Sequence, residues 1–535
     1  MSSVEEEESD TCSVGIDLGT TYSCVAVYED SEWNVIVDST GETRIPSVVC
    51  FSQNGITVGA TAKNQRILYP KDYIYNSKRF LGRRYSEINI TEQWGYDIVN
   101  FDGDVAFNVN LEKHLSPVRV SEELLKYIKL CAEDYTGKTV KKAVITVPAR
   151  FNHVQRQATL DAAKHAGFDD IFLLNEPTAA ALAFFHDLID TKEKHVVVYD
   201  FGGGTFDVSV LRIQGRNFTA LAACGDAHLG GADIDQLLAQ FCLKKWMDQY
   251  PNLNLTGEEQ QQLLHLCESA KKGLSDTDTK HFDLYVNNLT NPLGMDLNLE
   301  DLKREAKSIF EKTISLTNEA IASARLDRSQ VNHVVVVGGS SRIPYVRELL
   351  SSYFTSDQLS YGLDEDLAVA IGAAKLAHDW NQRAEIRDFV IQEFVSSSLG
   401  LKTYDDKMLV VIPRGERLPT TKDLKVTTLR NLQTQVNFFV LEGECDEAAG
   451  NSLLGNVVLS NLKPAPAGQL KLRIQFTFNV NSMLTVMAYD EETGEKQEVA
   501  LNCYGALSMH SSAELSDTGN RDSFIVSNES NNVCQ

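Results

Sequence analysis

The chain has 535 residues, of which 43% are hydrophobic and 23% charged, and its formal net charge is −24 at pH 7. This length predicts several domains, and the acidic balance argues against nucleic acid as the main partner, because phosphate contacts need a basic surface. No apolar run approaches transmembrane length and the acidic first ten residues do not resemble a secretory signal, so we expect no contact with a membrane. The ten cysteines follow no disulfide or zinc spacing, which indicates reduced residues in the cytoplasm or nucleus.

Strand and helix patterns alternate from residue 12 to residue 380. Apolar, β-branched runs predict strands over 13–16, 23–28, 140–147, 195–200, 206–213 and 333–337. Helical periodicity predicts helices over 121–135, 155–166, 179–187, 234–249, 257–274, 299–324 and 367–379. Mixed elements over this length predict an α/β domain with more than one lobe.

Beyond residue 393 the pattern changes to short alternating segments separated by turns. These segments predict strands over 408–412, 425–429, 435–442, 456–459, 470–478, 484–489 and 498–501, as in a β-sandwich. The segment before them, residues 387–394, is apolar and flanked by charged residues, whereas a plain linker would be polar. We therefore expect a linker that docks on a folded domain in at least one state. Residues 506–535 are rich in Ser and Asn, which predicts a disordered tail.

Two stretches far apart in the sequence share one pattern of residues. In each, an apolar strand ends in an aspartate, Asp17 or Asp200, and leads into a glycine-rich turn with threonine. Glycine lets backbone amides point at phosphate oxygens, threonine adds donors, and the aspartate can hold Mg²⁺ through water. One copy alone would be interpreted as a hairpin turn. Two copies predict a clamp for a nucleoside triphosphate, although neither is a Walker loop.

A third apolar strand leads into Gly338 and Gly339 with no aspartate before them, which fits a nucleoside better than a metal. Four polar residues near the end of the helix predicted over 257–274 fall at i, i+3, i+4 and i+7, on one face of the helical pattern: Glu268, Lys271, Lys272 and Ser275. That face is either a solvated surface or part of the nucleoside site, and the helix alone favours the first interpretation.

Five motifs follow one another along the chain. They are Asp17-Leu-Gly-Thr-Thr-Tyr22, Asn175-Glu-Pro-Thr-Ala-Ala-Ala181, Asp200-Phe-Gly-Gly-Gly-Thr-Phe-Asp207, His228-Leu-Gly-Gly-Ala-Asp233 and Val337-Gly-Gly-Ser-Ser-Arg-Ile-Pro344. Together they resemble the signatures of the 70-kDa heat-shock chaperone family (DnaK type). The resemblance implies an α/β, actin-like, two-lobed ATPase domain at 12–387, a linker at 388–394, an all-β sandwich that binds peptides at 395–505, and a polar tail at 506–535.

The resemblance also implies a role for single residues. The hydrolytic set would be Lys78, Glu176, Asp207, Asp17 and Thr205. Lys78 would position the attacking water, while Asp17 and Asp200 would hold the metal shell. The nucleotide would be bound by Gly19, Thr20, Thr21, Tyr22, Gly202, Gly203, Gly204, Thr205, Gly230, Gly231, Glu268, Lys271, Lys272, Ser275, Gly338, Gly339, Ser340, Arg342 and Asp366. The implied cofactors are ATP or ADP, Mg²⁺ and, as a further ion, K⁺.

Two further sets of residues are implied by the same resemblance. An apolar peptide pocket would be lined by Leu399, Leu401, Val436, Phe438 and Leu472. Coupling between the domains would depend on Pro148, Arg156, Asp388, Phe389, Val390 and Ile391. The implied partners are unfolded or extended polypeptides, a nucleotide exchange factor and J-domain cochaperones.

Several positions depart from the family pattern. Lys272 replaces an Arg that stacks on adenine, which predicts weaker nucleotide binding, and Ala232 replaces a Glu beside the ribose. Phe172 replaces an Arg that docks J-domain proteins, so we expect weakened stimulation by them. Gln392 replaces the last apolar residue of the linker, and Phe438 is bulkier than the usual Ile of the pocket.

Where the family has a helical lid, only about 30 polar residues follow the sandwich, so we expect peptide to bind weakly and leave quickly. The first hypothesis is a slow, ATP-hydrolysing chaperone for extended hydrophobic peptides. The alternative is an ATP-binding, non-cycling adaptor or co-chaperone that regulates another chaperone or the ribosome. A sugar or acetate kinase fits poorly, because such enzymes have no apolar linker leading to a β-sandwich.

Overall fold

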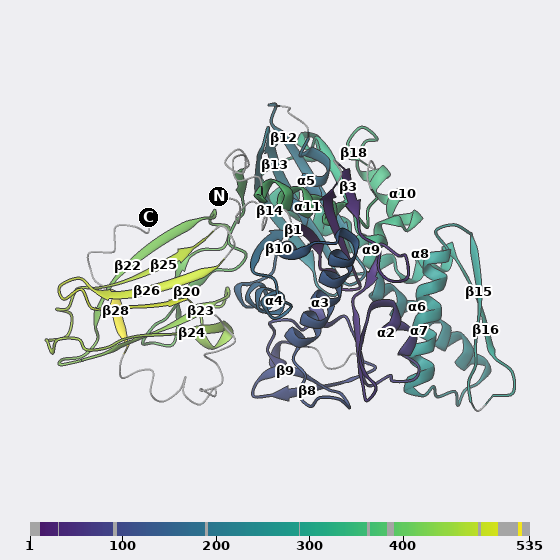
Figure 1. Cartoon of the computed structure of the whole chain (residues 1–535), viewed down its shortest axis with the longest axis horizontal. Coiled ribbons are helices and arrows are strands. Elements are labelled where there is room, and N and C mark those ends of the chain that lie inside the picture. Colours follow the sequence, from purple (N-terminus) through teal and green to yellow (C-terminus); the bar gives the residue numbers. More distant parts are fainter. Residues whose placement is uncertain are drawn as a thin grey trace. The chain divides into compact units, whose positions relative to one another are not determined.

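Figure 1 shows a computed structural model of the chain, which describes residues 11–29, 32–88, 94–187, 191–287, 289–360, 364–381, 390–479, 483–500 and 523–526. The chain forms two compact units. The first joins residues 1–150 with 160–390, and the second joins 151–159 with 391–535. Within the described ranges, no helix combines the length and the apolar character needed to cross a bilayer.

The first unit is built on two six-stranded sheets. One sheet has the order β11 (Asp170–Asn175), β10 (Thr139–Val147), β1 (Thr11–Asp17), β2 (Tyr22–Glu29) and β3 (Glu32–Val35), with β4 (Ile45–Pro46) beside β2. Strand β1 is parallel to β10 and antiparallel to β2. Helix α11 (Ala368–Asn381) packs on β1, and Gly15 lies directly against its backbone at Ala373 and Ala374, where a Cβ would clash.

The other sheet repeats this plan. Its order is β18 (Leu359–Ser360), β17 (His333–Val337), β12 (Lys194–Phe201), β13 (Phe206–Gln214), β14 (Asn217–Asp226) and β19 (Val390–Gln392). Strand β12 is parallel to β17 and antiparallel to β13, as β1 is to β10 and β2. Each sheet therefore places one aspartate-glycine turn between a central strand and its antiparallel neighbour.

Smaller elements complete the first unit. Its short sheets are β5 (Val48–Ser52) with β6 (Gly55–Val58) and β7 (Tyr73–Tyr75), β8 (Asp97–Phe101) with β9 (Asp104–Asn108), and β15 (Thr279–Leu284) with β16 (Leu293–Asn298). Its other helices are α2 (Gly59–Gln65), α3 (Pro117–Thr136), α5 (Glu176–Phe185), α6 (Gly231–Gln249), α7 (Gly257–Gly273), α8 (Leu299–Glu305), α9 (Lys307–Ser323) and α10 (Pro344–Tyr353). The 3₁₀ turns are η1 (Ser77–Arg79), η2 (Tyr85–Glu87), η3 (Arg328–Gln330) and η4 (Gly339–Arg342). Helix α4 (His153–His165) begins in the second unit and ends in the first.

Helix ends follow local chemistry. Helix α3 begins at Pro117, four residues before the predicted start, because the Ser116 hydroxyl accepts a hydrogen bond from the Arg119 N–H and caps the first turn. The single helix predicted over 299–324 is two helices, α8 and α9, which meet at Ala306, where the backbone leaves the helical region (φ −95°, ψ 10°).

The second unit contains two facing sheets. One has the order β21 (Met408–Ile412), β20 (Leu399–Lys402), β23 (Val436–Glu442) and β24 (Ser452–Leu459), with the turn η6 (Ala448–Gly450) between β23 and β24. The other has the order β27 (Lys496–Ala500), β26 (Leu484–Asp490), β25 (Leu472–Phe478), β22 (Thr420–Thr428) and β28 (Phe524–Val526). Alternate residues of β25 and β26 are buried, and apolar residues of both sheets form one core, which is the arrangement of a β-sandwich.

Strand β28 differs from the expectation of a disordered tail. Phe524, Ile525 and Val526 form a strand antiparallel to β22, and Phe524 is buried. The polar composition around them predicts disorder, but three consecutive apolar residues of high β propensity can pair with an open sheet edge.

Candidate active site

The two aspartate-glycine turns lie against each other. A Cβ added to Gly204 would come within 2.6 Å of the Thr20 side chain, and Gly203 is similarly close to Thr21. The second turn is closed by a hydrogen bond from the Gly202 N–H to the Thr205 carbonyl (3.0 Å). Because glycine leaves no side chain between the turns, the backbone of one approaches the threonines of the other.

A cavity of about 400 Å³ lies between these turns. Most of the residues predicted for the active site line it: Asp17, Gly19, Thr20, Thr21, Tyr22, Lys78, Glu176, Asp200, Gly202, Gly203, Gly204, Thr205, Glu268, Lys271, Lys272, Ser275, Gly338, Gly339, Ser340, Arg342 and Asp366. The three predicted residues that do not line it are Asp207, Gly230 and Gly231. Asp207 lies opposite Asp200 in the β12–β13 pair, and the two glycines pack behind the second turn.

Lys78 and Glu176 form a buried ion pair in the wall of this cavity. The Lys78 ammonium donates to a Glu176 carboxylate oxygen at 2.7 Å and to the Leu18 carbonyl at 2.5 Å. Only 8% of Lys78 and 7% of Glu176 is exposed. Asp17 accepts a hydrogen bond from the Thr146 hydroxyl at 3.2 Å.

Three aspartates lie in the same buried region. Burial and then the Glu176 carboxylate raise the pKa of Asp17 to about 7 and the pKa of Asp207 to about 7. Burial, followed by the neighbouring carboxylates, also raises the pKa of Asp200 well above its ordinary value. The cluster therefore holds more negative charge than Lys78 alone neutralises.

These residues fit a metal-bound nucleotide. Buried carboxylates that repel one another are stabilised by a cation, and carboxylate oxygen is a ligand that Mg²⁺ accepts. The Thr21 hydroxyl oxygen is buried and has no hydrogen-bond partner within the described part of the chain, so it is available to a phosphate oxygen. The donor set and the glycine turns thus match the needs of Mg²⁺ and a polyphosphate.

Arg79 connects the second turn to helix α6. Its guanidinium donates to the Gly204 carbonyl at 2.6 Å and to the Asp233 carboxylate at 3.1 Å. Asp233 in turn accepts from the Gly230 N–H at 2.7 Å, which satisfies an amide at the start of the helix. No motif indicated Arg79, although it is adjacent to Lys78 in the sequence.

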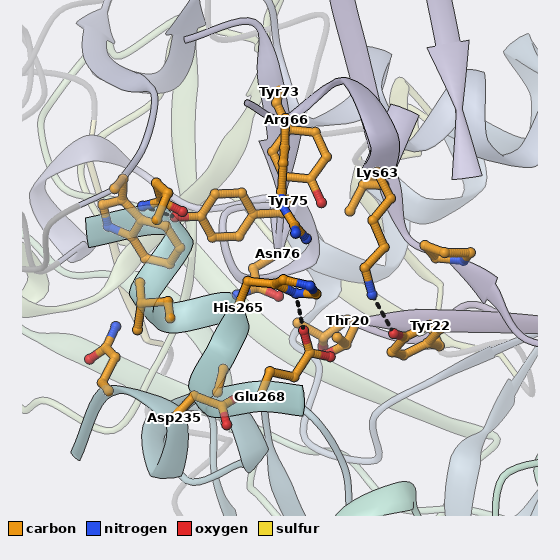
Figure 2. Close-up of a pocket in the computed structure, with 18 of the residues that line it drawn as sticks. Thr20, Tyr22, Lys63, Arg66, Tyr73, Tyr75, Asn76, Asp235, His265 and Glu268 are labelled. Carbon is orange, nitrogen blue, oxygen red and sulfur yellow. Dashed lines mark hydrogen bonds and ion pairs between the residues drawn. The ribbon is translucent and has the colours of Figure 1, made fainter. Parts of the chain in front are cut away.

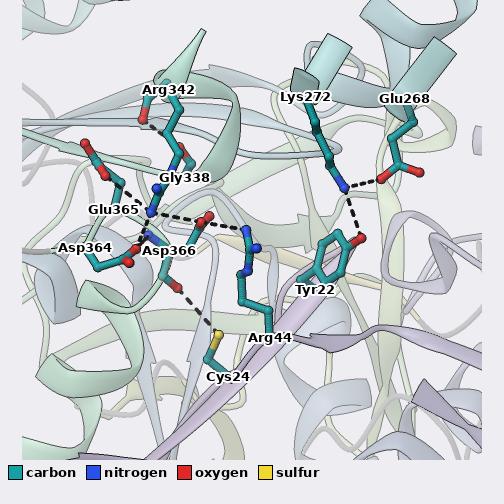
Figure 3. Close-up of polar contacts among 11 residues, drawn as sticks. Tyr22, Cys24, Arg44, Glu268, Lys272, Gly338, Arg342, Asp364, Glu365 and Asp366 are labelled. Carbon is teal, nitrogen blue, oxygen red and sulfur yellow. Dashed lines mark hydrogen bonds and ion pairs between the residues drawn. The ribbon is translucent and has the colours of Figure 1, made fainter. Parts of the chain in front are cut away.

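Charged side chains also line the cavity beside Tyr22 (Figure 3). Lys272 forms an ion pair with Glu268 at 2.5 Å and donates to the Tyr22 hydroxyl at 3.1 Å. Burial alone would raise the pKa of Glu268, but His265, Lys272 and Lys63 outweigh it and lower that pKa.

Two arginines face the acidic segment Asp364, Glu365 and Asp366. Arg342 pairs with all three residues, and Arg44 forms an ion pair with Asp366 at 3.0 Å. Lys272 and Arg342 therefore both line the cavity and are both held by acidic side chains.

A second pocket, of about 150 Å³, adjoins the first (Figure 2). It shares Thr20, Tyr22 and Glu268 with the larger cavity. Its own lining is aromatic and basic: Lys63, Arg66, Tyr73, Tyr75 and Trp94. The Lys63 ammonium points at Tyr22 and donates to its hydroxyl at 2.8 Å. The sequence did not indicate this pocket, because the residues of its own lining belong to none of the five motifs.

The predicted coupling residues are placed only in part. Pro148 follows β10 and is buried, and the Arg156 guanidinium donates to the Phe151 carbonyl at 3.1 Å. The Val390 N–H donates to the Arg216 carbonyl at 3.2 Å, and Val390 and Ile391 belong to β19. Asp388 and Phe389 lie outside the described residues.

The residues predicted to line a peptide pocket are core residues in this structure. All five, Leu399, Leu401, Val436, Phe438 and Leu472, are buried in the sandwich core. The Phe524 ring of β28 lies 5.2 Å from the Phe438 ring, centroid to centroid.

Phe172, which replaces the family's J-domain-docking Arg, lies in the first unit. Its ring packs on the Trp380 ring, with 6.1 Å between the centroids.

Some cavity residues were not predicted. Arg44, Asp235 and Glu365 line the cavity, and Asp235 accepts from the Lys271 ammonium at 2.8 Å. The signal for Asp235 was weak: it follows the glycine pair by one helical turn, which places it on the face of α6 toward that pair.

Comparison with known proteins identifies the family. The family model described as "Hsp70 protein" matches residues 13–523. The chain is 37% identical over 511 residues to a heat shock protein of the SSB type from Pyricularia oryzae, covering 92% of this chain and 83% of that protein. It is 37% identical over 514 residues to the ribosome-associated molecular chaperone SSB of Candida glabrata (92% and 82% covered), and 36% identical over 517 residues to a ribosome-associated molecular chaperone of the same type from Saccharomyces cerevisiae (92% and 82% covered). The chain therefore belongs to the Hsp70 family.

Proposed function

We propose that this protein hydrolyses ATP slowly at the cavity between its two glycine turns and uses the cycle to regulate weak binding of extended hydrophobic segments of unfolded proteins. As a member of the Hsp70 family, the chain is an ATP-dependent chaperone and an ATPase. The observation that carries the residue-level proposal is the buried Lys78–Glu176 pair beside three aspartates whose pKa values are raised.

Each residue of the hydrolytic set has a chemical reason for its role. Lys78 carries a positive charge fixed at 2.7 Å from Glu176, so it can orient a water and offset charge that develops on the γ-phosphate. Glu176 and Asp207 would accept hydrogen bonds from ordered water, and Asp17 and Asp200 would supply oxygens for Mg²⁺. Mg²⁺ neutralises phosphate charge when bound, and K⁺ is proposed as an additional ion. Thr205 closes the second phosphate turn.

The nucleotide contacts follow the cavity. The turns at Gly19 to Tyr22 and Gly202 to Thr205 are proposed to hold the phosphates. The nucleoside is proposed to lie among Glu268, Lys271, Lys272, Ser275, Gly338, Gly339, Ser340, Arg342 and Asp366. Gly230 and Gly231 support the second turn from behind. The domain limits 12–387, 388–394 and 395–505 remain part of this proposal.

The proposed partners are unfolded or extended polypeptides. Phe172, packed on Trp380, offers a J-domain protein no positive charge, so stimulation by such cochaperones is proposed to be weak. A nucleotide exchange factor is also proposed. The names of two relatives place those proteins at ribosomes, which favours the cytoplasm for this chain, and the comparisons give no support to the nucleus.

The test of this proposal is the effect of peptide on ATP turnover. Purified protein with bound, radiolabelled ATP and Mg²⁺ would be mixed with a heptapeptide that has three central leucines flanked by polar residues. Faster hydrolysis with peptide supports a coupled chaperone. ATP binding with no response to peptide, at any concentration that occupies the sandwich, contradicts it and favours a non-cycling adaptor.

A further inference from the structure

The C-terminal strand β28 lies at an edge of the sandwich that would otherwise be open. Val526, Ile525 and Phe524 pair antiparallel with Val426, Thr427 and Thr428 of β22. In the order β27-β26-β25-β22-β28, β22 is the last strand of the sheet before β28 is added. Without β28, the backbone groups of Val426–Thr428 that face this strand would be open to pairing with an extended segment, the binding mode called β-augmentation.

Phe524 anchors β28 in the core. It is 2% exposed, its ring packs on Phe438, and it belongs to the same apolar cluster as Leu399, Val436 and Leu472. Phe438 and these three residues are part of the predicted peptide pocket. One side chain from an extended segment thus lies among the residues that the sequence assigns to client recognition.

A polar contact fixes the start of the strand. The Gln433 side-chain amide donates to the Ser523 carbonyl at 3.0 Å, and both residues are buried. The same amide group donates to the Gln435 carbonyl at 2.8 Å. Gln433 lies between β22 and β23, so the segment is held by backbone pairing, an apolar anchor and a side-chain amide, as an extended peptide ligand would be.

The contact also has an unfavourable part. The Thr427 and Thr428 hydroxyls are buried on β22 with no hydrogen-bond partner within the described part of the chain. Burying a hydroxyl without a partner costs free energy. Both residues pair directly with β28. Two hydroxyl groups at this contact therefore lack hydrogen-bond partners within the described residues, which favours a docked segment that can leave.

We propose that Ser523–Val526 is an intramolecular ligand that occupies the groove where a client segment binds, so that the chain competes with its own clients. The sequence Arg-Asp-Ser-Phe-Ile-Val-Ser-Asn at 521–528 has the composition of such a client: three apolar residues between polar ones. This inference rests on the proposed peptide-binding function of the sandwich. It assigns to the tail a regulatory role that its polar composition does not reveal.

Tethering makes the competition strong. The segment follows the end of β27 at Ala500 by 23 residues, so it is always near the groove. A tether of this length gives an effective concentration on the order of millimolar. A peptide added at micromolar concentration therefore meets a groove already occupied, and displacing the tail is expected to tighten its binding by about tenfold or more.

The first experiment measures binding of the fluorescent heptapeptide to full-length protein and to Phe524→Ser, with Val533→Ser as the control for a lost apolar residue elsewhere in the tail. We expect about tenfold or more tighter binding to Phe524→Ser and no change with Val533→Ser. Equal affinity for wild type and Phe524→Ser, with a lower melting temperature of the variant, would overturn the proposal and make β28 a permanent core strand.

A second experiment separates this inference from the proposed function. A fluorescent peptide of residues 519–530 is added to Phe524→Ser, beside the same peptide with Ser at the Phe position. Binding of the natural peptide alone supports the inference, even where the heptapeptide binds neither protein and client binding fails. Absence of binding by the tail peptide overturns the inference.

Hydrogen exchange on the wild-type chain tests the same claim without a variant. Adding saturating heptapeptide is expected to accelerate exchange at the amides of Phe524–Val526 while leaving β25 unchanged. Bound heptapeptide with unchanged exchange at these amides would contradict the proposal.

Discussion

The backbone of Gly230 lies directly against the backbone of Gly204: a Cβ on Gly230 would come within 2.5 Å of the Gly204 carbonyl carbon. Gly230 precedes helix α6, and Gly204 belongs to the second glycine turn. The position of that turn, and with it the proposed phosphate site, is therefore set by the absence of a side chain at residue 230.

Substitution of Gly230 by Ala should weaken nucleotide binding. The new methyl group has only backbone atoms to push against, and overpacking of this kind costs about 1–3 kcal/mol, which is about five- to 150-fold if all of it is lost from the affinity. Titration with a fluorescent ATP analogue measures the change. Gly257→Ala is the matched control, because nothing lies within 4 Å of a Cβ at Gly257. A Gly230→Ala protein that binds as tightly as the control would contradict this account of the turn.

Lys272→Arg should strengthen nucleotide binding. Lys272 lines the cavity where we propose that the nucleoside lies, and its side chain is half-exposed. A planar guanidinium can stack on an adenine ring where an ammonium cannot. An exposed cation–π contact contributes about 0.5–1 kcal/mol, so we expect about two- to fivefold tighter binding by calorimetry. The pair with Glu268 is kept by either cation. Weaker binding of the variant would place the adenine elsewhere.

His186 should make the stability of the protein depend on pH. Its two ring nitrogens lie 2.7 Å from Asp187 and 2.7 Å from Asp379. Burial lowers the pKa of His186, but hydrogen bonds to Asp379 and Asp187 outweigh burial and raise that pKa above its ordinary value. Because the folded pKa is the higher one, the stabilisation is complete below about pH 6.5 and is lost as the pH rises through the folded pKa.

The measurement is chemical unfolding at pH 6 and pH 8 for wild type and His186→Gln. The loss of stability caused by the substitution should be larger at pH 6 than at pH 8. Asp379→Asn removes one carboxylate partner and should reduce the same pH dependence. A substitution effect that is equal at both pH values would show that His186 carries no charge in this range.

The family and the general fold could be predicted from the sequence. The predicted Hsp70 family and the predicted ATP-dependent chaperone class are confirmed. The strand-turn-strand pattern around Asp17 and Asp200 could be predicted because each strand is a continuous apolar run that ends in a sharp change of composition. The roles given to single site residues stay predictions.

The remaining site residues depend on tertiary contacts that local patterns do not encode. Arg79 and Asp233 meet across 154 positions of sequence, and Asp235 meets Lys271 across 36. In each pair, the member that was not predicted, Arg79 or Asp235, does not differ locally from a solvated charge. The predicted start of α3 at residue 121 was wrong by four residues, because Ser116 as N-cap and Pro117 at the first helical position mark the start.

Strand β28 could not be predicted from the amino-acid composition of the tail. A window that averages over the tail is polar, so three apolar residues at 524–526 disappear in the average. Their structure depends on an open edge of β22 and on Phe438, which are distant in sequence.

The central claim, that Lys78 serves hydrolysis, is tested most directly by single-turnover hydrolysis of bound ATP. Lys78→Ala should bind ATP but hydrolyse it about 10²–10³-fold more slowly, as when one preorganised donor to developing charge is removed. Lys375→Ala is the control for loss of a buried lysine, because Lys375 pairs with Asp187 at 2.7 Å and does not line the cavity. Its turnover should equal that of wild type. Unchanged turnover in Lys78→Ala, or an equal loss in Lys375→Ala, would contradict the account.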